Sequence, residues 1–125
     1  MDDLLRSVKP AVFVGSSRRD LRACPDEVRQ DIGQALYEVQ LGLHPKSAKP
    51  LKGFGSGVLE IRDNVDSDTY RAVYLVRFEE AVYVLHVFQK KSTRGISTPK
   101  RHLDLIKLRL REAIRIHEAS KEGRP

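Results

Sequence analysis

A chain of 125 residues with 40% hydrophobic and 32% charged residues has the size and composition of one folded domain with a single core. It has no run of eighteen apolar residues and no cationic start followed by an apolar segment, so we expect neither a membrane span nor a secretory signal. The single cysteine, Cys24, excludes an intramolecular disulfide and fits a reducing cytoplasm, where we expect the protein to be located.

The positive charge is concentrated near the C-terminus. From Met1 to Gln89 the sequence has 12 Lys or Arg against 13 Asp or Glu, a balance of −1. From Lys90 to Pro125 the counts are 11 and 4, a balance of +7. This segregation predicts an anionic partner, and charge alone leaves nucleic acid, an acidic protein and a lipid surface as alternatives.

The first elements predicted along the chain are a short strand and two helices. Residues 9–15 are β-branched and aromatic, which is typical of a strand. The sequence SRRD at residues 17–20 has the form of a capping box and predicts a short helix that ends before Pro25. Pro25 is expected at the first position of a second helix, and its apolar face is predicted to contain Val28, Ile32, Ala35, Leu36, Val39 and Leu43.

Residues 44–57, HPKSAKPLKGFGSG, are predicted to form a loop of the length usually reserved for functional segments. Lys52 stands at the start of the next strand, so we expect it and this loop to line the rim of a cleft. Lys46 and Lys49 are expected to be solvated residues of a connector.

Three strands and a long helix complete the predicted fold. The strands are expected near residues 57–63, 69–78 and 81–90, with links short enough for antiparallel hairpins. Thr98 is expected to cap the helix and Pro99 to be its first residue. Its apolar stripe is predicted to contain Leu103, Ile106, Leu110, Ala113, Ile114 and His117.

This order of elements predicts a single α+β domain over residues 1–125. An N-terminal strand and helical hairpin precede a three-stranded antiparallel meander, and a basic helix ends the chain. We expect a mostly antiparallel sheet of about four strands.

A cluster of cations follows the most apolar strand. The sequence FQKKSTRGISTP, residues 88–99, places Lys90, Lys91 and Arg94 among four hydroxyl side chains. The segment is either a solvated strand end or a site that holds an anion.

In the strand near residues 69–78, successive side chains are expected to point to opposite faces of the sheet. Arg71 and Arg77 are separated by an even number of positions, so both are expected on the same face. A guanidinium between apolar neighbours needs water, a carboxylate or a ligand. Arg62 is placed similarly in the preceding strand. A salt bridge is the structural alternative to a ligand, more so for Arg77 than for Arg71, and its candidate partners are Glu60, Asp63 and Glu79.

Motifs of phosphate-binding loops, dinucleotide-binding folds, serine hydrolases and zinc proteases are missing from the sequence. The four histidines lack metal-site spacing, so we expect no zinc. Cations, hydroxyls and one imidazole remain, a set that suits charge stabilisation at a phosphate. That imidazole is His86, whose ordinary pKa lies near neutrality, although a histidine within an apolar strand is commonly a satisfied core residue.

The segments KPLKGFGSGVLEIR, YRAVYLV and VLHVFQKKS…TPK, followed by a basic helix, resemble the RelE/HigB superfamily. The likeness is closest to its phage-associated, HigB-like branch and covers about residues 9–119. It implies a small α+β fold with a twisted antiparallel sheet. It also implies the toxin of a type II toxin–antitoxin pair that cleaves mRNA, commonly on the ribosome.

The resemblance also implies roles for individual residues. It places Lys52, Arg62, Arg71, Lys90 and Lys91 in a basic cleft, with Arg94 and Lys100 as further RNA contacts. The implied reaction needs no metal or other cofactor: the 2′-OH of RNA attacks the adjacent phosphate. The arginines then stabilise the phosphorane, Lys90 or Lys91 serves the leaving oxygen, and His86 is the candidate general base. We expect Arg71 and the lysine pair to serve activity and not folding.

One feature departs from the superfamily. Some members carry a Tyr, an Asp-Tyr or a His pair near the chain end for acid/base work, whereas no Tyr follows Tyr83 in this sequence.

The resemblance implies a cognate helix-turn-helix antitoxin as partner, mRNA as substrate, and contact with operator DNA only through the antitoxin. Two alternatives remain open: a ParE-like gyrase inhibitor, and a nucleic-acid-binding module without catalysis.

Overall fold

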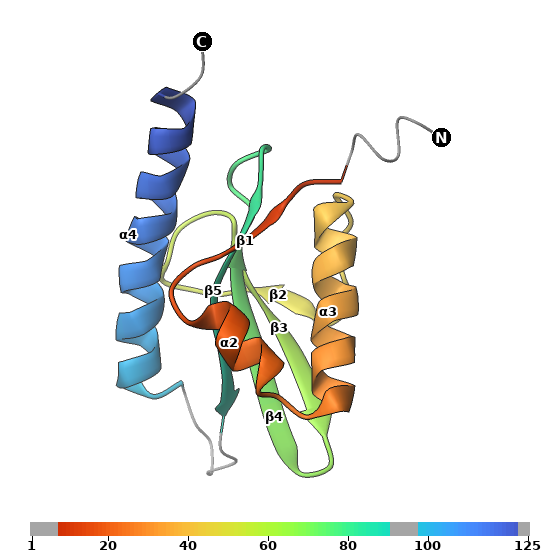
Figure 1. Ribbon diagram of the computed structural model, residues 1–125. Helices are drawn as coiled ribbons and strands as arrows, with labels where there is room; N and C mark the ends of the chain where they lie inside the picture. Colours follow the sequence, from red (N-terminus) through yellow and green to blue (C-terminus); the bar gives the residue numbers. More distant parts are fainter. Residues whose placement is uncertain (1–7, 91–97, 123–125) are drawn as a thin grey trace.

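The computed structural model describes residues 8–90 and 98–122, which form one mixed sheet with helices on both of its faces (Figure 1). Five strands follow the order β1-β5-β4-β3-β2. The strands are β1 (Ala11–Phe13), β2 (Ala48–Pro50), β3 (Val58–Val65), β4 (Asp68–Leu75) and β5 (Val82–Lys90). The predicted α+β class and the antiparallel meander of the last three strands are therefore confirmed.

The sheet differs from the prediction at its two edges. β1 runs parallel to β5, whereas every other neighbouring pair is antiparallel. At the opposite edge, the predicted loop of residues 44–57 contains β2, which pairs with β3 so that Lys49 lies opposite Glu60. Three residues that include Pro50 show no alternation, so no strand was predicted; the edge position tolerates a proline, which has no N–H.

Three helices lie in the described part of the chain: α2 (Ser17–Arg22), α3 (Asp26–Gln40) and α4 (Lys100–Glu122). Each predicted helix start was wrong by one residue. Ser17, expected to cap the first helix, is the first residue of α2, and Ser16 precedes it. Pro25 and Pro99, expected as first helical residues, each lie just before the helix, α3 and α4 respectively. The Pro99 carbonyl instead accepts the backbone N–H groups of the first turn of α4. None of these helices is both long and apolar enough to cross a membrane.

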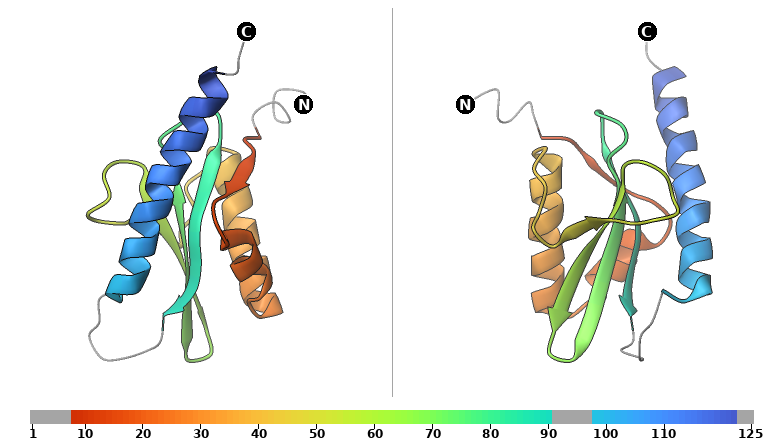
Figure 2. Two further views of the ribbon diagram at one scale, coloured as in Figure 1. Left: turned by 60° about the vertical axis from the view of Figure 1, so that its left-hand side comes forward. Right: turned by 180° about the vertical axis from the view of Figure 1, so that it is seen from behind.

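Helix α4 covers one face of the sheet and α2 and α3 cover the other, as two further views show (Figure 2). An apolar layer on each face holds the helices on the sheet. On one face the α3 stripe packs on inward residues of β3, β4 and β5, and the most buried members of this layer are Val28, Ile32, Ile61, Ala72, Tyr74, Val82 and Val84. On the other face α4 contributes Ile106 and Ala113 to a layer with Val58, Val73, Leu75 and Leu85. This second layer covers only part of its face, and charged side chains occupy the rest.

A bulge in β5 directs a histidine toward α4. Val73 of β4 lies opposite His86, and the next residue, Tyr74, lies opposite Val84, so Leu85 is the extra residue of β5. An extra residue interrupts the alternation of side chains along a strand. Leu85 and His86 consequently both face α4, where Leu85 packs in the core and His86 contacts polar groups.

Candidate functional site

A groove of about 480 Å³ opens between β2, the following turn, the central strands and the first turn of α4. Five of its lining residues are cationic and one is acidic. The lining residues are Lys49, Pro50, Leu51, Lys52, Glu60, Arg62, Arg71, Lys90, Thr98 and Leu103.

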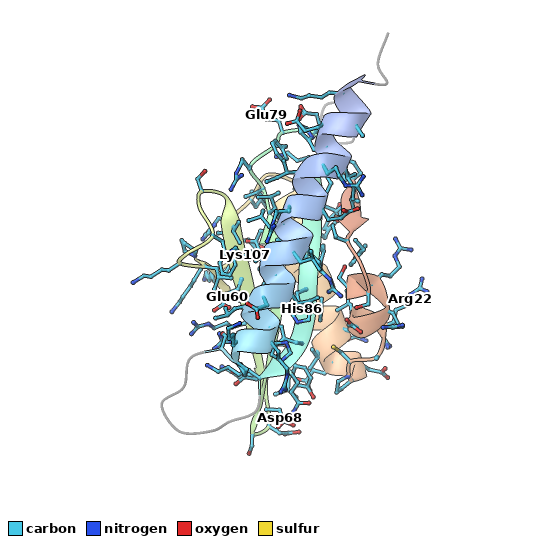
Figure 3. The ribbon with its side chains drawn as sticks, turned by 90° about the vertical axis from the view of Figure 1, so that its left-hand side faces the viewer. Arg22, Glu60, Asp68, Glu79, His86 and Lys107 are labelled. Carbon is cyan, nitrogen blue, oxygen red and sulfur yellow. The ribbon has the colours of Figure 1, made fainter. Side chains whose placement is uncertain are left out.

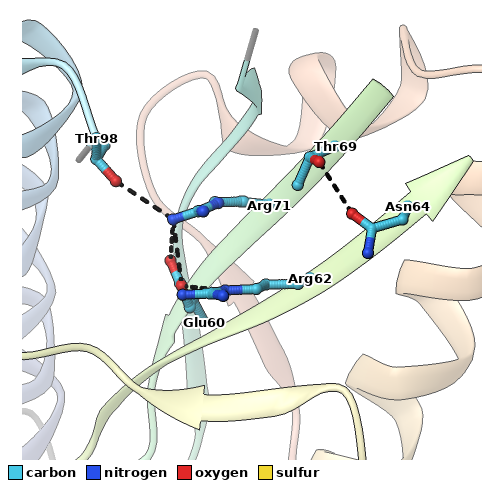
Figure 4. A network of polar contacts seen from close by, with 6 residues as sticks. All are labelled: Glu60, Arg62, Asn64, Thr69, Arg71 and Thr98. Atoms are coloured by element: carbon cyan, nitrogen blue, oxygen red, sulfur yellow. Dashed lines mark hydrogen bonds and ion pairs between the residues drawn. The ribbon is translucent and has the colours of Figure 1, made fainter. Parts of the chain in front are cut away.

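Glu60 is the centre of the charge arrangement (Figure 4). Its side chain is 3% exposed, and Oε1 accepts a 2.7 Å hydrogen bond from Nε of Arg62. Both carboxylate oxygens lie 3.3 Å from Nη1 of Arg71. A buried carboxylate is costly unless it is paired, so the two arginines stabilise Glu60 and Glu60 fixes their guanidinium groups.

The register of the sheet explains how these three side chains meet. Arg62 of β3 lies directly opposite Arg71 of β4, so the two cations share one face of the sheet. Like charges in this position repel. Glu60 precedes Arg62 by two residues and therefore lies on the same face, where it offsets the repulsion.

The two guanidinium groups differ in exposure. The Arg62 side chain is 45% exposed, whereas that of Arg71 is 10% exposed. Nη1 of Arg71 also donates to Oγ1 of Thr98 at 3.3 Å, and the buried Nε of Arg71 has no hydrogen-bond partner among the residues that the structure describes. The Arg71 guanidinium is thus held by Glu60 and by Thr98, and its Nε–H remains a donor for a further partner.

Lysines extend the positive charge on both sides of the arginines. Burial lowers the pKa of Lys90, and the neighbouring Arg71 and Arg62 lower it further, whereas Glu60 raises it. Lys90 therefore lies within reach of the charges of both arginines and of Glu60. Lys52 and Lys49 line the opposite rim. The arrangement therefore favours an anion that has several charges along its length.

The structure brings together four of the eight predicted site residues, because Lys52, Arg62, Arg71 and Lys90 all line the groove. Lys100 is exposed, with Nζ 2.7 Å from Oδ2 of Asp104, and is not part of the lining.

Two other predicted site residues, Lys91 and Arg94, lie outside the described residues. The salt-bridge alternative holds for Arg71, which pairs with Glu60. Arg77, for which a carboxylate was expected, instead donates from Nε to the Ser56 carbonyl at 3.0 Å.

His86 lies under α4 and not in the groove lining (Figure 3). It is 4% exposed; Nδ1 lies 3.1 Å from Nη1 of Arg109, and Nε2 lies 2.8 Å from Nδ1 of His102. Burial, together with the charges of Arg109 and His102, lowers the pKa of His86 to about 4. The His86 ring is therefore neutral near pH 7, and both of its nitrogens are in hydrogen-bond contact with side chains of α4. His86 therefore has no free ring nitrogen with which to contact a ligand in the groove.

Sequence reasoning missed several residues of this region. Lys49 lines the groove although it was expected to be a connector residue. Thr98, expected as a helix cap, contacts Arg71. Arg109 was overlooked, although its place between Ile106 and Ala113 on the apolar stripe of α4 is a readable sign of a buried polar contact.

Comparisons with known proteins gave a match to one family model and a similar solved structure. A family model described as "Phage derived protein Gp49-like" matches residues 19–111, which include every groove residue. A chain in the crystal structure of the toxin–antitoxin complex RelBE2 from Mycobacterium tuberculosis is similar at a TM-score of 0.49 and 23% identity. The similarity covers 67% of this chain and 93% of that chain. No curated protein gave a significant match.

Proposed function

This chain belongs to the phage-derived Gp49-like family, and we propose that it is the toxin of a type II toxin–antitoxin pair, of the HigB-like kind, that cleaves mRNA in the cytoplasm. The observation that carries the proposal is the groove, in which two arginines and three lysines surround one carboxylate. Single-stranded RNA has a phosphate at every nucleotide, and cationic grooves that follow its backbone are the usual means of binding it.

The proposed reaction begins with one phosphate between Arg62 and Arg71. The 2′-OH loses its proton to solvent and attacks phosphorus, the bond to the 5′ oxygen breaks, and a 2′,3′-cyclic phosphate and a 5′-OH result. Because Glu60 and Thr98 fix the Arg71 guanidinium, its donors need little rearrangement as charge develops on the phosphorane. One such preorganised donor is worth roughly 10²–10³ in rate.

The lysines have separate roles in the proposal. Lys90 gives a proton to the leaving 5′ oxygen, which its lowered pKa makes easier. Lys52 and Lys49 hold the flanking phosphates. We propose the translating ribosome as the place where mRNA meets the groove, and a helix-turn-helix antitoxin with acidic side chains as the partner that covers the same cations.

The proposal is tested by inducing the protein in a bacterial host while measuring growth, protein synthesis and plasmid supercoiling. We expect growth and synthesis to stop, mRNA to be cut, and supercoiling to stay unchanged. Relaxed plasmid with intact mRNA would identify the gyrase inhibitor, and binding of RNA without cleavage would identify the non-catalytic module.

Lysine variants locate the RNA. Lys52→Ala should weaken RNA binding and reduce the slope of log affinity against log salt by about one phosphate contact. Lys46→Ala is the matched control, because Lys46 is an exposed lysine nearby that does not line the groove. Equal effects of the two substitutions would refute the placement of RNA in the groove.

A further inference from the structure

A chain of hydrogen bonds runs under α4, from α2 to the first turn of α4. Ser16 Oγ donates to Oδ2 of Asp20 at 2.7 Å and accepts from Nη2 of Arg109 at 2.8 Å. Nη1 of Arg109 lies 3.1 Å from Nδ1 of His86, and Nε2 of His86 lies 2.8 Å from Nδ1 of His102. Three segments distant in sequence, at α2, β5 and α4, are joined in this way.

The chemistry of arginine gives this chain a direction. A guanidinium only donates, so Nδ1 of His86 must accept the bond from Arg109 and carry no proton. The neutral His86 ring then carries its proton on Nε2 and donates it to Nδ1 of His102. His102 in turn, when neutral, must carry its own proton on Nε2. One arginine thus fixes the tautomers of two histidines.

The surroundings keep both rings neutral and Arg109 in place. Burial and the charge of Arg101 lower the pKa of His102, as burial and Arg109 do for His86. Arg109 is 9% exposed and also donates to the Leu85 carbonyl at 3.1 Å. Gly15 makes room for it, because a Cβ there would lie 2.6 Å from Nε of Arg109.

His102 packs on a residue that neighbours Arg71 in the sheet. Its ring stacks on Phe88, with centroids 4.2 Å apart, and Phe88 is the β5 residue directly opposite Arg71. The next residue of α4, Leu103, lines the groove itself. Since Nδ1 is turned toward His86, Nε2 is on the other side of a ring that belongs to a partly exposed residue.

We propose that His102 donates its Nε2–H to a phosphate oxygen of RNA bound beside Arg71, and that Arg109, acting through His86, holds that proton on Nε2. His102 is thereby a neutral hydrogen-bond donor and not a general base. The inference rests on the proposed function, because it takes RNA phosphate as the ligand. Arg109 and His86 are positioning residues that do not touch the RNA.

The tautomers are measured first, on the ¹⁵N-labelled protein without RNA, by long-range ¹H–¹⁵N correlation of the imidazole rings near pH 7. We expect both His86 and His102 to carry their protons on Nε2. A proton on Nδ1 of His102 would overturn the inference whatever the protein does with RNA.

The donor role is measured with a 2′-O-methylated single-stranded RNA, which binds without being cleaved. His102→Phe keeps an aromatic ring over Phe88 but has no N–H, and should weaken binding about tenfold, the value of one hydrogen bond to a charged group. His102→Gln, whose amide N–H reaches a similar position, should recover most of the affinity.

Arg71→Lys separates this inference from the proposed function. If Arg71→Lys weakens binding and His102→Phe does not, the donor role is refuted and the groove stands. If His102→Phe binds like the parent, the donor role is refuted whatever Arg71→Lys does, and if the parent binds no RNA, both proposals fail. A purely structural role of His102 would lower the melting temperature of the Phe and Gln variants alike without separating their affinities.

Discussion

Two buried histidines lie at opposite ends of α4, His86 beneath the helix and His117 on the helix itself, and their surroundings differ in chemistry. Near the C-terminal end of α4 His117 is 1% exposed and stacks on Phe78, with ring centroids 3.7 Å apart. Within the described residues neither ring nitrogen of His117 has a hydrogen bond, and Nε2 lies 3.6 Å from Oε1 of Glu80. Near the N-terminal end both nitrogens of His86 are bonded, in a chain that ends beside the cationic groove.

The difference shows that a buried imidazole is not by itself a sign of function. His117 behaves as a flat aromatic plate between Phe78 and the edge of Tyr83, and its unpaired nitrogens cost stability. His86 belongs to a directed network because a bulge turns it toward a buried arginine. Figure 3 shows how the ends are separated: His86 and Glu60 lie toward one end of α4 and Glu79 toward the other.

The largest expected effect comes from Arg71→Ala in the groove. It should lower RNA cleavage about a hundredfold or more, because a fixed donor to the phosphorane is lost. It should also lower the free energy of unfolding by about 3 kcal/mol, since the buried Glu60 loses one of the two arginines that pair with it. Arg71 is thus expected to serve folding as well, unlike the interpretation drawn from sequence.

A double variant separates the two effects in chemical denaturation and cleavage assays. Adding Glu60→Gln to Arg71→Ala removes the uncompensated charge, so stability should return in part while cleavage stays low. Cleavage that recovers together with stability would assign Arg71 a structural role only.

The next largest effect is the loss of stability when His86 becomes charged. Its pKa is lowered from 6.5 to about 4, so the folded protein binds fewer protons there than the unfolded chain. The stabilisation is fully present above pH 6.5 and is lost as the pH falls toward 4, by up to about 3 kcal/mol.

The titration of Asp63 changes the stability with pH in the opposite direction and would mask the loss due to His86. Asp63 is therefore replaced in this experiment. Burial, with the carboxyls of Asp31 and Glu27, raises the pKa of Asp63 to about 6, so its contribution is present at low pH and is lost as the pH rises through 6. Denaturation of Asp63→Asn between pH 7 and 4 should therefore show the loss of stability from the two histidines whose pKa is lowered, His86 and His102. A flat profile in this variant would contradict the buried, neutral state of His86.

A smaller effect is expected at Gly15, which supports Arg109. Its φ is +58° and a Cβ there would meet the guanidinium, so Gly15→Ala should lower the free energy of unfolding by about 1–3 kcal/mol. Gly33→Ala is the control, because that glycine lies within α3 with nothing within 4 Å of an added Cβ, and it should stabilise by about 0.5–1 kcal/mol. If Gly15→Ala melts at a higher temperature than Gly33→Ala, an added Cβ at position 15 does not crowd the Arg109 guanidinium.

The smallest effect is expected at the other end of α4. His117→Phe keeps the stack on Phe78 and removes two unpaired nitrogens, so it should leave cleavage unchanged and change the free energy of unfolding by less than about 1 kcal/mol. Parallel melts and cleavage assays of His117→Phe and His102→Phe complete the comparison. A loss of cleavage in His117→Phe would show that the two ends are coupled.

The sequence predicts the parts of this molecule that follow local rules. Periodicity marks the apolar faces of α3 and α4, and alternation correctly places Arg71 on the same face as Val73. Features that depend on contacts between distant segments are not visible in the pattern. β2 is too short to alternate, and the bulge at Leu85 appears only in the register between β4 and β5.

The candidate site likewise contains one contact that the sequence predicts and others that depend on distant segments meeting. Glu60 and Arg62 are two residues apart on one strand, so their pairing is readable from sequence. The chain from Asp20 to His102 depends on α2, β5 and α4 meeting, which requires the fold.

The most direct test of the central claim, that the groove holds and cleaves RNA at a phosphate, is to map the ends of mRNA in translating extract. The parent protein and Arg71→Lys are compared at equal folded concentration, because the lysine keeps a positive charge beside Glu60 but loses the guanidinium fork. If the claim holds, the parent gives fragments with 2′,3′-cyclic phosphate and 5′-OH ends and the variant gives about a hundredfold fewer. Intact mRNA with the parent, or equal cleavage by a folded Arg71→Lys protein, would contradict it.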